Sequence, residues 1–203
     1  SCDTYFYKLS LKVGINVIAE TLQALGLGTK TNTDLPGEFV GVVPSPEWKK
    51  KRYKKPWYAG ETLNATIGQG DMLVTPLQVA KFTAAIATGK NIAPKFALSV
   101  GGKAVEAKIT ALPIAFDPKM LNVIREGMYQ VCSVQGGTAF SSLGYLPIKV
   151  AGKSGTAQVS TIAQSEINRM KEDQLEYYKR SHAWLTTYAP YENPKYVVTA
   201  LVE

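Results

Sequence analysis

The residues best suited to chemistry are Lys153, Ser154, Gly155 and Thr156, which follow one another at what reads as the start of a β-strand. The lysine supplies positive charge and the two hydroxyls supply hydrogen-bond donors and acceptors. Four such residues also occur by chance at ordinary strand entries, so the run alone does not distinguish a functional site from an ordinary strand.

A second polar group, Ser1-Cys2-Asp3, stands at the beginning of the sequence, ahead of a helix-like segment. Ser and Asp commonly cap helices, which is the structural interpretation of this group. A catalytic interpretation follows from the motif set Ser-x-x-Lys, Ser-x-Asn and Lys-Thr-Gly of serine β-lactamases and penicillin-binding proteins. Ser1-Cys2-Asp3 resembles the second motif and Lys153-Ser154-Gly155-Thr156 the third, in the right order.

The elements that must position these residues follow from periodicity and turn residues. Runs rich in Val, Thr and Tyr predict three antiparallel strands, at residues 148–160, 183–189 and 195–202. Apolar spacing and capping residues predict three core helices, at residues 15–25, 75–88 and 118–132. We expect a long ordered loop region at 26–70, a hairpin around Gly101-Gly102 and a surface helix or insertion at 166–179. This order predicts an α+β fold in which helices cover an antiparallel sheet.

Composition limits the function further. The 203 residues suit one globular domain, and no apolar run reaches the ~18 residues of a membrane span. Two cysteines do not indicate a disulfide framework.

The formal net charge of +7 comes almost entirely from one basic run, which consists of Lys49, Lys50, Lys51, Arg52, Lys54 and Lys55. Because this basic run accompanies no nucleic-acid-binding module, we do not expect nucleic acid as a partner. A solvated loop pinned by Trp48 and Trp57 is one interpretation, and contact with an anionic lipid, lipid-linked substrate or partner protein is the other.

Further segments extend the resemblance to nearly the whole chain. These segments are Asp34-Leu35-Pro36-Gly37-Glu38, Glu47-Trp48-Lys49, Trp57-Tyr58-Ala59-Gly60-Glu61-Thr62, Ile67-Gly68-Gln69-Gly70, Thr75-Pro76-Leu77-Gln78, Gly137-Thr138-Ala139 and His182-Ala183-Trp184. Together with the two motifs, they resemble the transpeptidase domain of class B penicillin-binding proteins. The Glu-Trp-Lys run and the Ser-Cys-Asp opening are most similar to the penicillin-binding protein 2 subfamily, the elongation enzymes.

The resemblance implies a D,D-transpeptidase that cross-links peptidoglycan stem peptides through a serine acyl-enzyme and is acylated by β-lactams. It implies that Lys153, Ser154 and Thr156 bind the substrate carboxylate and that Gly155 leaves room for the substrate backbone. The Thr156 N–H would form half of the oxyanion hole. Ser1 would relay a proton to the leaving amine, and Asp3 would contact the substrate or orient Lys153.

The family needs no metal and no cofactor, and we assign the single histidine, His182, a structural role. We expect Cys2 to be a small buried residue.

The sequence departs from the family pattern at two points. Asp3 stands where Asn is general, which replaces an amide by a carboxylate that only accepts hydrogen bonds when ionised. No serine of the chain is followed three residues later by lysine, so the nucleophile motif is missing from these residues. In the family that motif precedes Ser-x-Asn. We therefore expect residues 1–203 to be the central and C-terminal part of one transpeptidase domain, cut at both ends and inactive in isolation.

The resemblance also implies partners and a location. The partners are stem peptides, β-lactams, the segment with Ser-x-x-Lys, a membrane glycosyltransferase and a rod-shape scaffold protein. The location is the periplasmic face of the bacterial inner membrane, with a single-pass anchor outside this chain. Two alternatives stay open. A division-type class B transpeptidase is one, which Asp3 disfavours because that type commonly carries Asn. A catalytically silent scaffold that binds β-lactams or peptidoglycan is the other.

Overall fold

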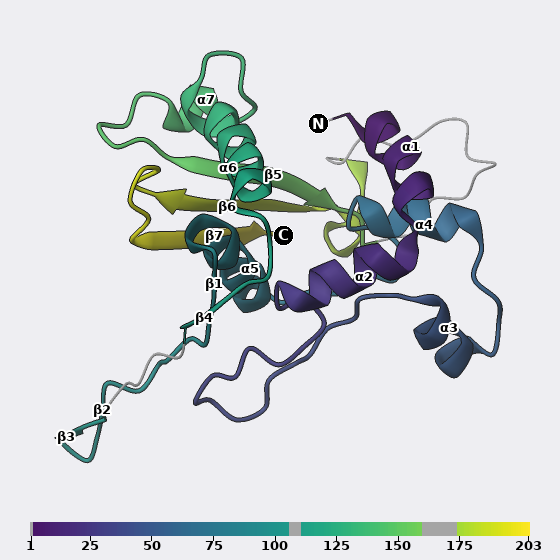
Figure 1. Ribbon diagram of the computed structural model, residues 1–203, viewed down its shortest axis with the longest axis horizontal. Helices are drawn as coiled ribbons and strands as arrows, with labels where there is room; N and C mark the ends of the chain where they lie inside the picture. The colour runs from purple at the N-terminus through teal and green to yellow at the C-terminus, as the bar shows by residue number, and fades with distance from the viewer. Residues whose placement is uncertain (1, 106–110, 160–173) are drawn as a thin grey trace. The chain divides into compact units, whose positions relative to one another are not determined.

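The computed structural model describes residues 2–105, 111–159 and 174–203 (Figure 1). The chain divides into two compact units, Ser1–Asn122 and Val123–Glu203, and each is described by itself. Helices combine with antiparallel strands, so the predicted α+β class is confirmed. Over the described ranges, no helix has both the length and the apolar character that crossing a bilayer requires.

The first unit is mainly helical. Its helices are α1 (Asp3–Val13), α2 (Ile15–Ala24), α3 (Pro46–Tyr53), α4 (Ala59–Thr66) and α5 (Pro76–Thr88). A hydrophobic cluster forms around Ala19 of α2 and two loop residues, Leu27 and Val43, and Phe82 of α5 packs against it. The amphipathic helix predicted at 15–25 is therefore present and faces the core.

Helix α5 begins and ends where its capping residues predict. The Thr75 side chain accepts a hydrogen bond from the Gln78 N–H, and the Gln78 side chain accepts one from the Thr75 N–H, which completes a capping box. Gly89 closes the helix in the left-handed conformation, with φ of 72°. Gln78 does more than cap, because its buried Nε2 also donates to the carbonyls of Thr29 and Val40. One side chain thus joins the helix start to the loop before α3.

The prediction of a continuous loop region over 26–70 is wrong in part, because α3 and α4 lie within it. Sequence periodicity did not indicate α3, since five of its eight residues are charged and it has no apolar stripe. Its start is nevertheless well encoded. Ser45 accepts a hydrogen bond from the Trp48 N–H, and Pro46 occupies the first helical position.

Two short pairs of strands complete the first unit. Strand β1 (Lys90–Ile92) pairs with β4 (Ala111–Pro113), and β2 (Ser99–Val100) pairs with β3 (Lys103–Ala104). The second pair confirms the hairpin predicted around Gly101-Gly102, although its strands are shorter than expected. Figure 1 shows this hairpin at the tip of an extended arm.

The second unit contains a three-stranded antiparallel sheet. Its strands are β5 (Ala151–Ala157), β6 (His182–Ala189) and β7 (Tyr196–Val202), in the order β5-β6-β7. All three predicted strands are confirmed, and residues 190–195 connect the last two. Helix α6 (Pro118–Ser133), which starts in the first unit, follows its predicted range, and α7 (Phe140–Leu143) is a single turn. Most of the insertion predicted at 166–179 lies outside the described residues, and its last part forms the 3₁₀ turn η2 (Tyr177–Lys179).

Strand β5 is attached to the end of α6 immediately before its first residue. The Ser133 hydroxyl donates to the Val150 carbonyl at 2.8 Å, and the Val150 N–H donates to the same hydroxyl oxygen at 3.2 Å. Farther along the unit, Tyr129 of α6 stacks on Tyr191, whose hydroxyl donates to Glu126. These contacts hold the helix against one end of the β5-β6 pair, where β5 begins and β6 ends, since Tyr191 follows β6 and its N–H donates to the Lys149 carbonyl.

Candidate active site

The Lys153–Thr156 run lies in the middle of β5, at one edge of the described sheet. Lys153 pairs with Thr186, Ser154 with Leu185, Gly155 with Trp184 and Thr156 with Ala183, without a bulge. Among the strands that the structure describes, β5 has a neighbour on one side only, which is β6. The other edge therefore presents N–H and C=O groups to which an extended peptide could add as a further strand.

Alternation along β5 divides the four residues between two faces. Lys153 and Gly155 share one face of the sheet, and Ser154 and Thr156 share the other. Lys153, Gly155 and Thr156 are exposed, and Ser154 is half-buried. The Lys153 ammonium donates to the Ser154 carbonyl at 2.7 Å, which holds the cation beside the strand. A ligand at the edge could thus meet charge from one face and hydroxyls from the other.

The two glycines of β5 differ in whether packing requires them. A Cβ built on Gly152 would lie 2.4 Å from the Thr186 carbonyl oxygen and 2.7 Å from Thr187 Cγ2, so packing against β6 excludes any side chain there. A Cβ on Gly155 would meet only Trp184 Cβ, at an ordinary 3.5 Å. The packing of the described residues therefore explains Gly152 and leaves Gly155 unexplained. Close approach of a ligand backbone would account for Gly155.

The Ser1-Cys2-Asp3 group lies in the other unit. Ser1 is outside the described residues, and Asp3 is the first residue of α1, where a carboxylate is favoured by the helix dipole. The structure therefore gathers Lys153, Ser154, Gly155 and Thr156 on one strand, whereas Asp3 belongs to a separately described unit.

The expectation that Cys2 is buried is wrong. Its side chain is exposed at the residue immediately before α1. The Thr4 hydroxyl lies 3.4 Å from Cys2 Sγ, and this hydrogen bond, followed by that of the Tyr5 N–H, lowers the pKa of the thiol. The second cysteine, Cys132, is buried in α6, and burial raises the pKa of its thiol.

His182 opens β6 opposite Ala157, at the end of β5, and is half-buried. The structural role expected of His182 stays a prediction. Trp184, two residues on, lies opposite Gly155 and supplies the Cβ that packs nearest to it. Sequence reasoning assigned no role to Trp184 or to Ser133. Both act through contacts between segments far apart in the sequence, and a single sequence carries no signal for such contacts.

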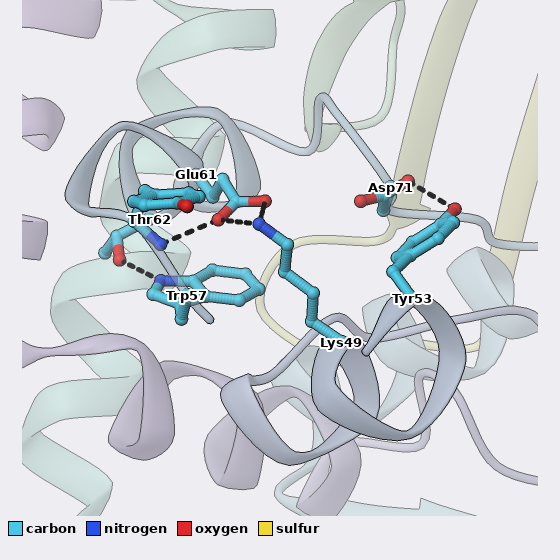
Figure 2. Close-up of polar contacts among 7 residues, drawn as sticks. Lys49, Tyr53, Trp57, Glu61, Thr62 and Asp71 are labelled. Atoms are coloured by element: carbon cyan, nitrogen blue, oxygen red, sulfur yellow. Dashed lines mark hydrogen bonds and ion pairs between the residues drawn. The ribbon is translucent and has the colours of Figure 1, made fainter. Parts of the chain in front are cut away.

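A different lysine is buried in the first unit. Lys49 of α3 is 6% exposed, and its ammonium contacts both carboxylate oxygens of Glu61 at 2.5 Å (Figure 2). The same carboxylate accepts a hydrogen bond from the Tyr58 N–H and so closes the capping box of α4. The Tyr58 ring lies 4.6 Å from the ammonium. Lys49 was counted with the exposed basic run in the sequence, and its position shows that it is an internal residue.

Comparison with known proteins agrees with this description. The family model "Penicillin binding protein transpeptidase domain" matches residues 1–203. The chain is 38% identical over 208 residues to the peptidoglycan D,D-transpeptidase MrdA of Haemophilus influenzae, a match that covers 100% of the chain and 32% of that protein.

Solved structures of the same kind are similar in fold. A complex between penicillin-binding protein 2 and MreC from Helicobacter pylori matches with a TM-score of 0.84 and 43% identity, over 99% of this chain and 34% of that one. Pseudomonas aeruginosa penicillin-binding protein 2 matches with a TM-score of 0.82 and 35% identity, over 99% of this chain and 42% of that one. The chain thus spans about a third of the length of the curated relative and of the first of these structures. The predicted resemblance, including the elongation subtype, is confirmed.

Proposed function

Because the chain belongs to the penicillin-binding protein transpeptidase family, we propose that it is part of a peptidoglycan D,D-transpeptidase of the elongation type. The observation that carries the proposal is the exposed edge of β5, where a lysine, two hydroxyls and a glycine without a packing role follow one another. All 203 residues would serve one transpeptidase domain.

The edge of β5 would bind the donor stem peptide. The peptide would lie along the strand and exchange backbone hydrogen bonds with it, and its C-terminal carboxylate would meet the Lys153 ammonium and the hydroxyls of Ser154 and Thr156. Gly155 would allow the two backbones to approach closely. The Thr156 N–H would donate to the carbonyl oxygen of the scissile bond, where negative charge develops.

The reaction would proceed in two steps. A serine hydroxyl attacks the carbonyl carbon of the D-Ala-D-Ala bond, the C–N bond breaks, and the leaving D-Ala amine takes a proton. The acyl group then passes to an amine of a neighbouring stem peptide, which loses a proton. Ser1 would relay the proton to the leaving amine, with Asp3 contacting substrate or orienting Lys153. The nucleophile would come from a Ser-x-x-Lys motif, which these 203 residues do not contain.

Partners and location extend the same proposal. The similar Helicobacter pylori protein was solved in complex with MreC, and this supports a rod-shape scaffold protein as a partner here. A membrane glycosyltransferase would supply the nascent strands. The domain would work at the periplasmic face of the inner membrane, and the membrane anchor would be a segment other than these residues.

Labelling of the full-length protein tests the proposal. We expect fluorescent penicillin to form a stoichiometric covalent adduct, and a stem pentapeptide ending in D-Ala-D-Ala to release D-Ala. A pentapeptide ending in L-Ala-L-Ala is the matched control and should release nothing. A folded full-length protein that takes no label and releases no D-Ala would refute the proposal and favour the silent scaffold.

A further inference from the structure

The charge of the chain is concentrated on one exposed segment of the first unit. Five cations project from the last turns of α3 and the two residues after it: Lys50, Lys51, Arg52, Lys54 and Lys55. We call this set the basic α3 surface. Over the residues that the structure describes, the ion pairs are Lys49–Glu61, Lys149–Glu192 and Lys179–Glu176, so none of the five cations is paired with a carboxylate.

The unpaired cations are not explained by helix stability. Cations are favourable near a helix C-terminus, but like charges three or four residues apart repel one another. Lys54 and Lys55 lie beyond the last helical residue, Tyr53. Five neighbouring cations therefore exceed what an eight-residue helix can use, and an anionic ligand would relieve their repulsion.

The helix is held rigidly from its inner side. Figure 2 shows Lys49 pointing from α3 to Glu61, and Trp57 lying beside this pair. Trp57 Nε1 donates to the Thr62 hydroxyl at 2.9 Å, which fixes the segment after the basic α3 surface to α4. The internal lysine and the exposed cations thus have separate tasks, because Lys49 anchors the helix whose outer side carries the five.

The ends of the helix are fixed as well. Lys54 adopts a left-handed conformation with φ of 58°, and its N–H donates to the Lys50 carbonyl at 3.1 Å. This conformation is uncommon for a residue other than glycine. The Tyr53 hydroxyl donates to Asp71 (Figure 2). The Tyr53 ring packs edge-on against Trp48. A surface ordered before binding loses little conformational entropy when a ligand arrives.

The chemistry of the surface favours a soluble polyanion over a bilayer. Helices that lie on membranes bury a face rich in Leu, Phe or Trp below their cations. In α3 no residue is aliphatic apart from Pro46, and Trp48 is half-buried against the protein. The exposed aromatic rings beside the cations are those of Tyr53 and Tyr58, which carry hydroxyls and suit contact with sugars. The surface therefore fits a polymer with spaced carboxylates and saccharide rings.

We propose that the basic α3 surface binds peptidoglycan strands through the free carboxylates of their stem peptides. This inference rests on the proposed function, which makes peptidoglycan the polymer that the protein works on. It assigns a binding site to residues outside the motifs that carry catalysis. The site would retain the polymer between successive acylations.

Co-sedimentation of the full-length protein with purified sacculi tests the proposal. The test variant carries K50Q, K51Q, R52Q, K54Q and K55Q, and the matched control removes five exposed lysines elsewhere in the unit: K8Q, K12Q, K30Q, K95Q and K103Q. We expect the test variant to bind at least ~10-fold more weakly at low salt and the control less than ~3-fold more weakly. Sacculi whose carboxylates have been converted to amides should bind the wild type at least ~10-fold more weakly, for the same reason.

Two further readouts separate the possible failures. The wild type and the test variant should bind vesicles containing phosphatidylglycerol equally, and weaker vesicle binding by the test variant than by the wild type would overturn the proposal in favour of a membrane surface. Equal sacculus binding by the test variant and the control would also overturn it. Both variants should keep the thermal midpoint and the penicillin labelling of the wild type. Loss of labelling in the wild type would instead refute the proposed function.

Discussion

The two lysines on which the chemistry of this chain could depend, Lys49 and Lys153, lie in opposite environments. Lys49 is buried in the first unit between the Glu61 carboxylate and the Tyr58 ring. Lys153 is exposed on the edge strand of the second unit, where its ammonium contacts a backbone carbonyl. A place in a motif that resembles the family therefore does not by itself assign a role to a lysine. Burial and partners make Lys49 a structural residue and leave Lys153 accessible to a ligand.

The difference extends to the surroundings of the two lysines. The first unit uses charged side chains as internal contacts: Lys81 Nζ donates to the Thr31 carbonyl, and the Glu38 carboxylate accepts hydrogen bonds from Thr31 and Thr33. Burial lowers the pKa of Lys81, although nearby Glu38 opposes this. The β5-β6-β7 sheet is held by its backbone ladder and by contacts such as the Thr186–Thr199 hydroxyl pair. Buried charged contacts thus help to hold the loops of the first unit, whereas backbone and hydroxyl contacts hold the sheet that carries the candidate site.

Replacing Lys153 by Gln in the full-length protein should have the largest effect on acylation. A hydrogen bond to a charged group contributes about 1.5–3 kcal/mol, so the second-order rate constant for fluorescent penicillin should fall about 10- to 100-fold. Stability should change by less than ~0.5 kcal/mol, because the side chain is exposed. Lys195→Gln, at an exposed position of the same unit, is the matched control. A variant that acylates at the wild-type rate would remove Lys153 from the site.

Replacing Lys49 by Met should give the reverse pattern. Breaking a fully buried ion pair costs 3–5 kcal/mol. The Glu61 side chain is 28% exposed, so we expect a loss of about 2–3 kcal/mol in unfolding free energy. The double variant Lys49→Met with Glu61→Gln should recover part of this loss, since no charge is left unpaired and the amide oxygen can still accept the Tyr58 N–H. Urea denaturation measures both. Acylation per folded molecule should stay within about twofold, and a large drop in it would make Lys49 functional as well.

The two glycines of β5 offer a test within one strand. Gly152→Ala should destabilise the protein by about 1–3 kcal/mol, because the new Cβ would overlap the Thr186 carbonyl oxygen at 2.4 Å. Gly155→Ala should change stability by less than ~0.5 kcal/mol, because a Cβ there meets only Trp184 Cβ at an ordinary distance. It should lower the acylation rate, because the new methyl group would keep the ligand backbone from approaching the strand. Thermal unfolding and penicillin labelling of both variants distinguish these outcomes. Equal destabilisation by the two would show that Gly155 is also a packing requirement.

Much of the fold could be predicted because its signals are local. The Thr75, Pro76 and Gln78 capping residues and the terminal Gly89 set the ends of α5, and the Val- and Thr-rich runs set the three long strands. Helix α3 escaped prediction, because its stability comes from a cap and from Lys49 reaching Glu61 twelve residues later. Neither contact produces the apolar periodicity by which a helix is recognised in sequence.

The residues of the candidate site could be predicted from the sequence, but their arrangement in space could not. The Lys153–Thr156 run could be picked out from residue types and motif order. Its position at the sheet edge, the division of its side chains between two faces and the contrast of Gly152 with Gly155 depend on pairing with β6. That pairing joins segments about thirty residues apart. For the same reason, the sequence predicted Lys49 to be exposed and Cys2 to be buried, and both predictions were wrong.

Acid should loosen the first unit before the sheet, and this is the smallest effect that we predict. Asp34 accepts hydrogen bonds from the N–H groups of Phe96 and Ala97, at 2.9 and 3.0 Å. The Ala97 and then the Phe96 hydrogen bond lower the pKa of Asp34 to about 2. Since the folded-state pKa lies below the unfolded value of about 3.9, the contribution of Asp34 is fully present above pH 4 and is lost as pH falls toward 2.

Amide hydrogen exchange between pH 5 and pH 2.5, corrected for the intrinsic pH dependence, measures this effect. Protection of the Phe96 and Ala97 amides should decrease as pH falls, whereas protection of the β6 and β7 amides should hold, because no carboxylate takes part in the ladder between these strands. Asp34→Asn should show low protection at both ends of the range, since an amide oxygen is a weaker acceptor than a carboxylate. Equal loss of protection in both regions would mean that the charged contacts of the first unit do not set its acid sensitivity, and the contrast between the two regions would then be confined to the two lysines.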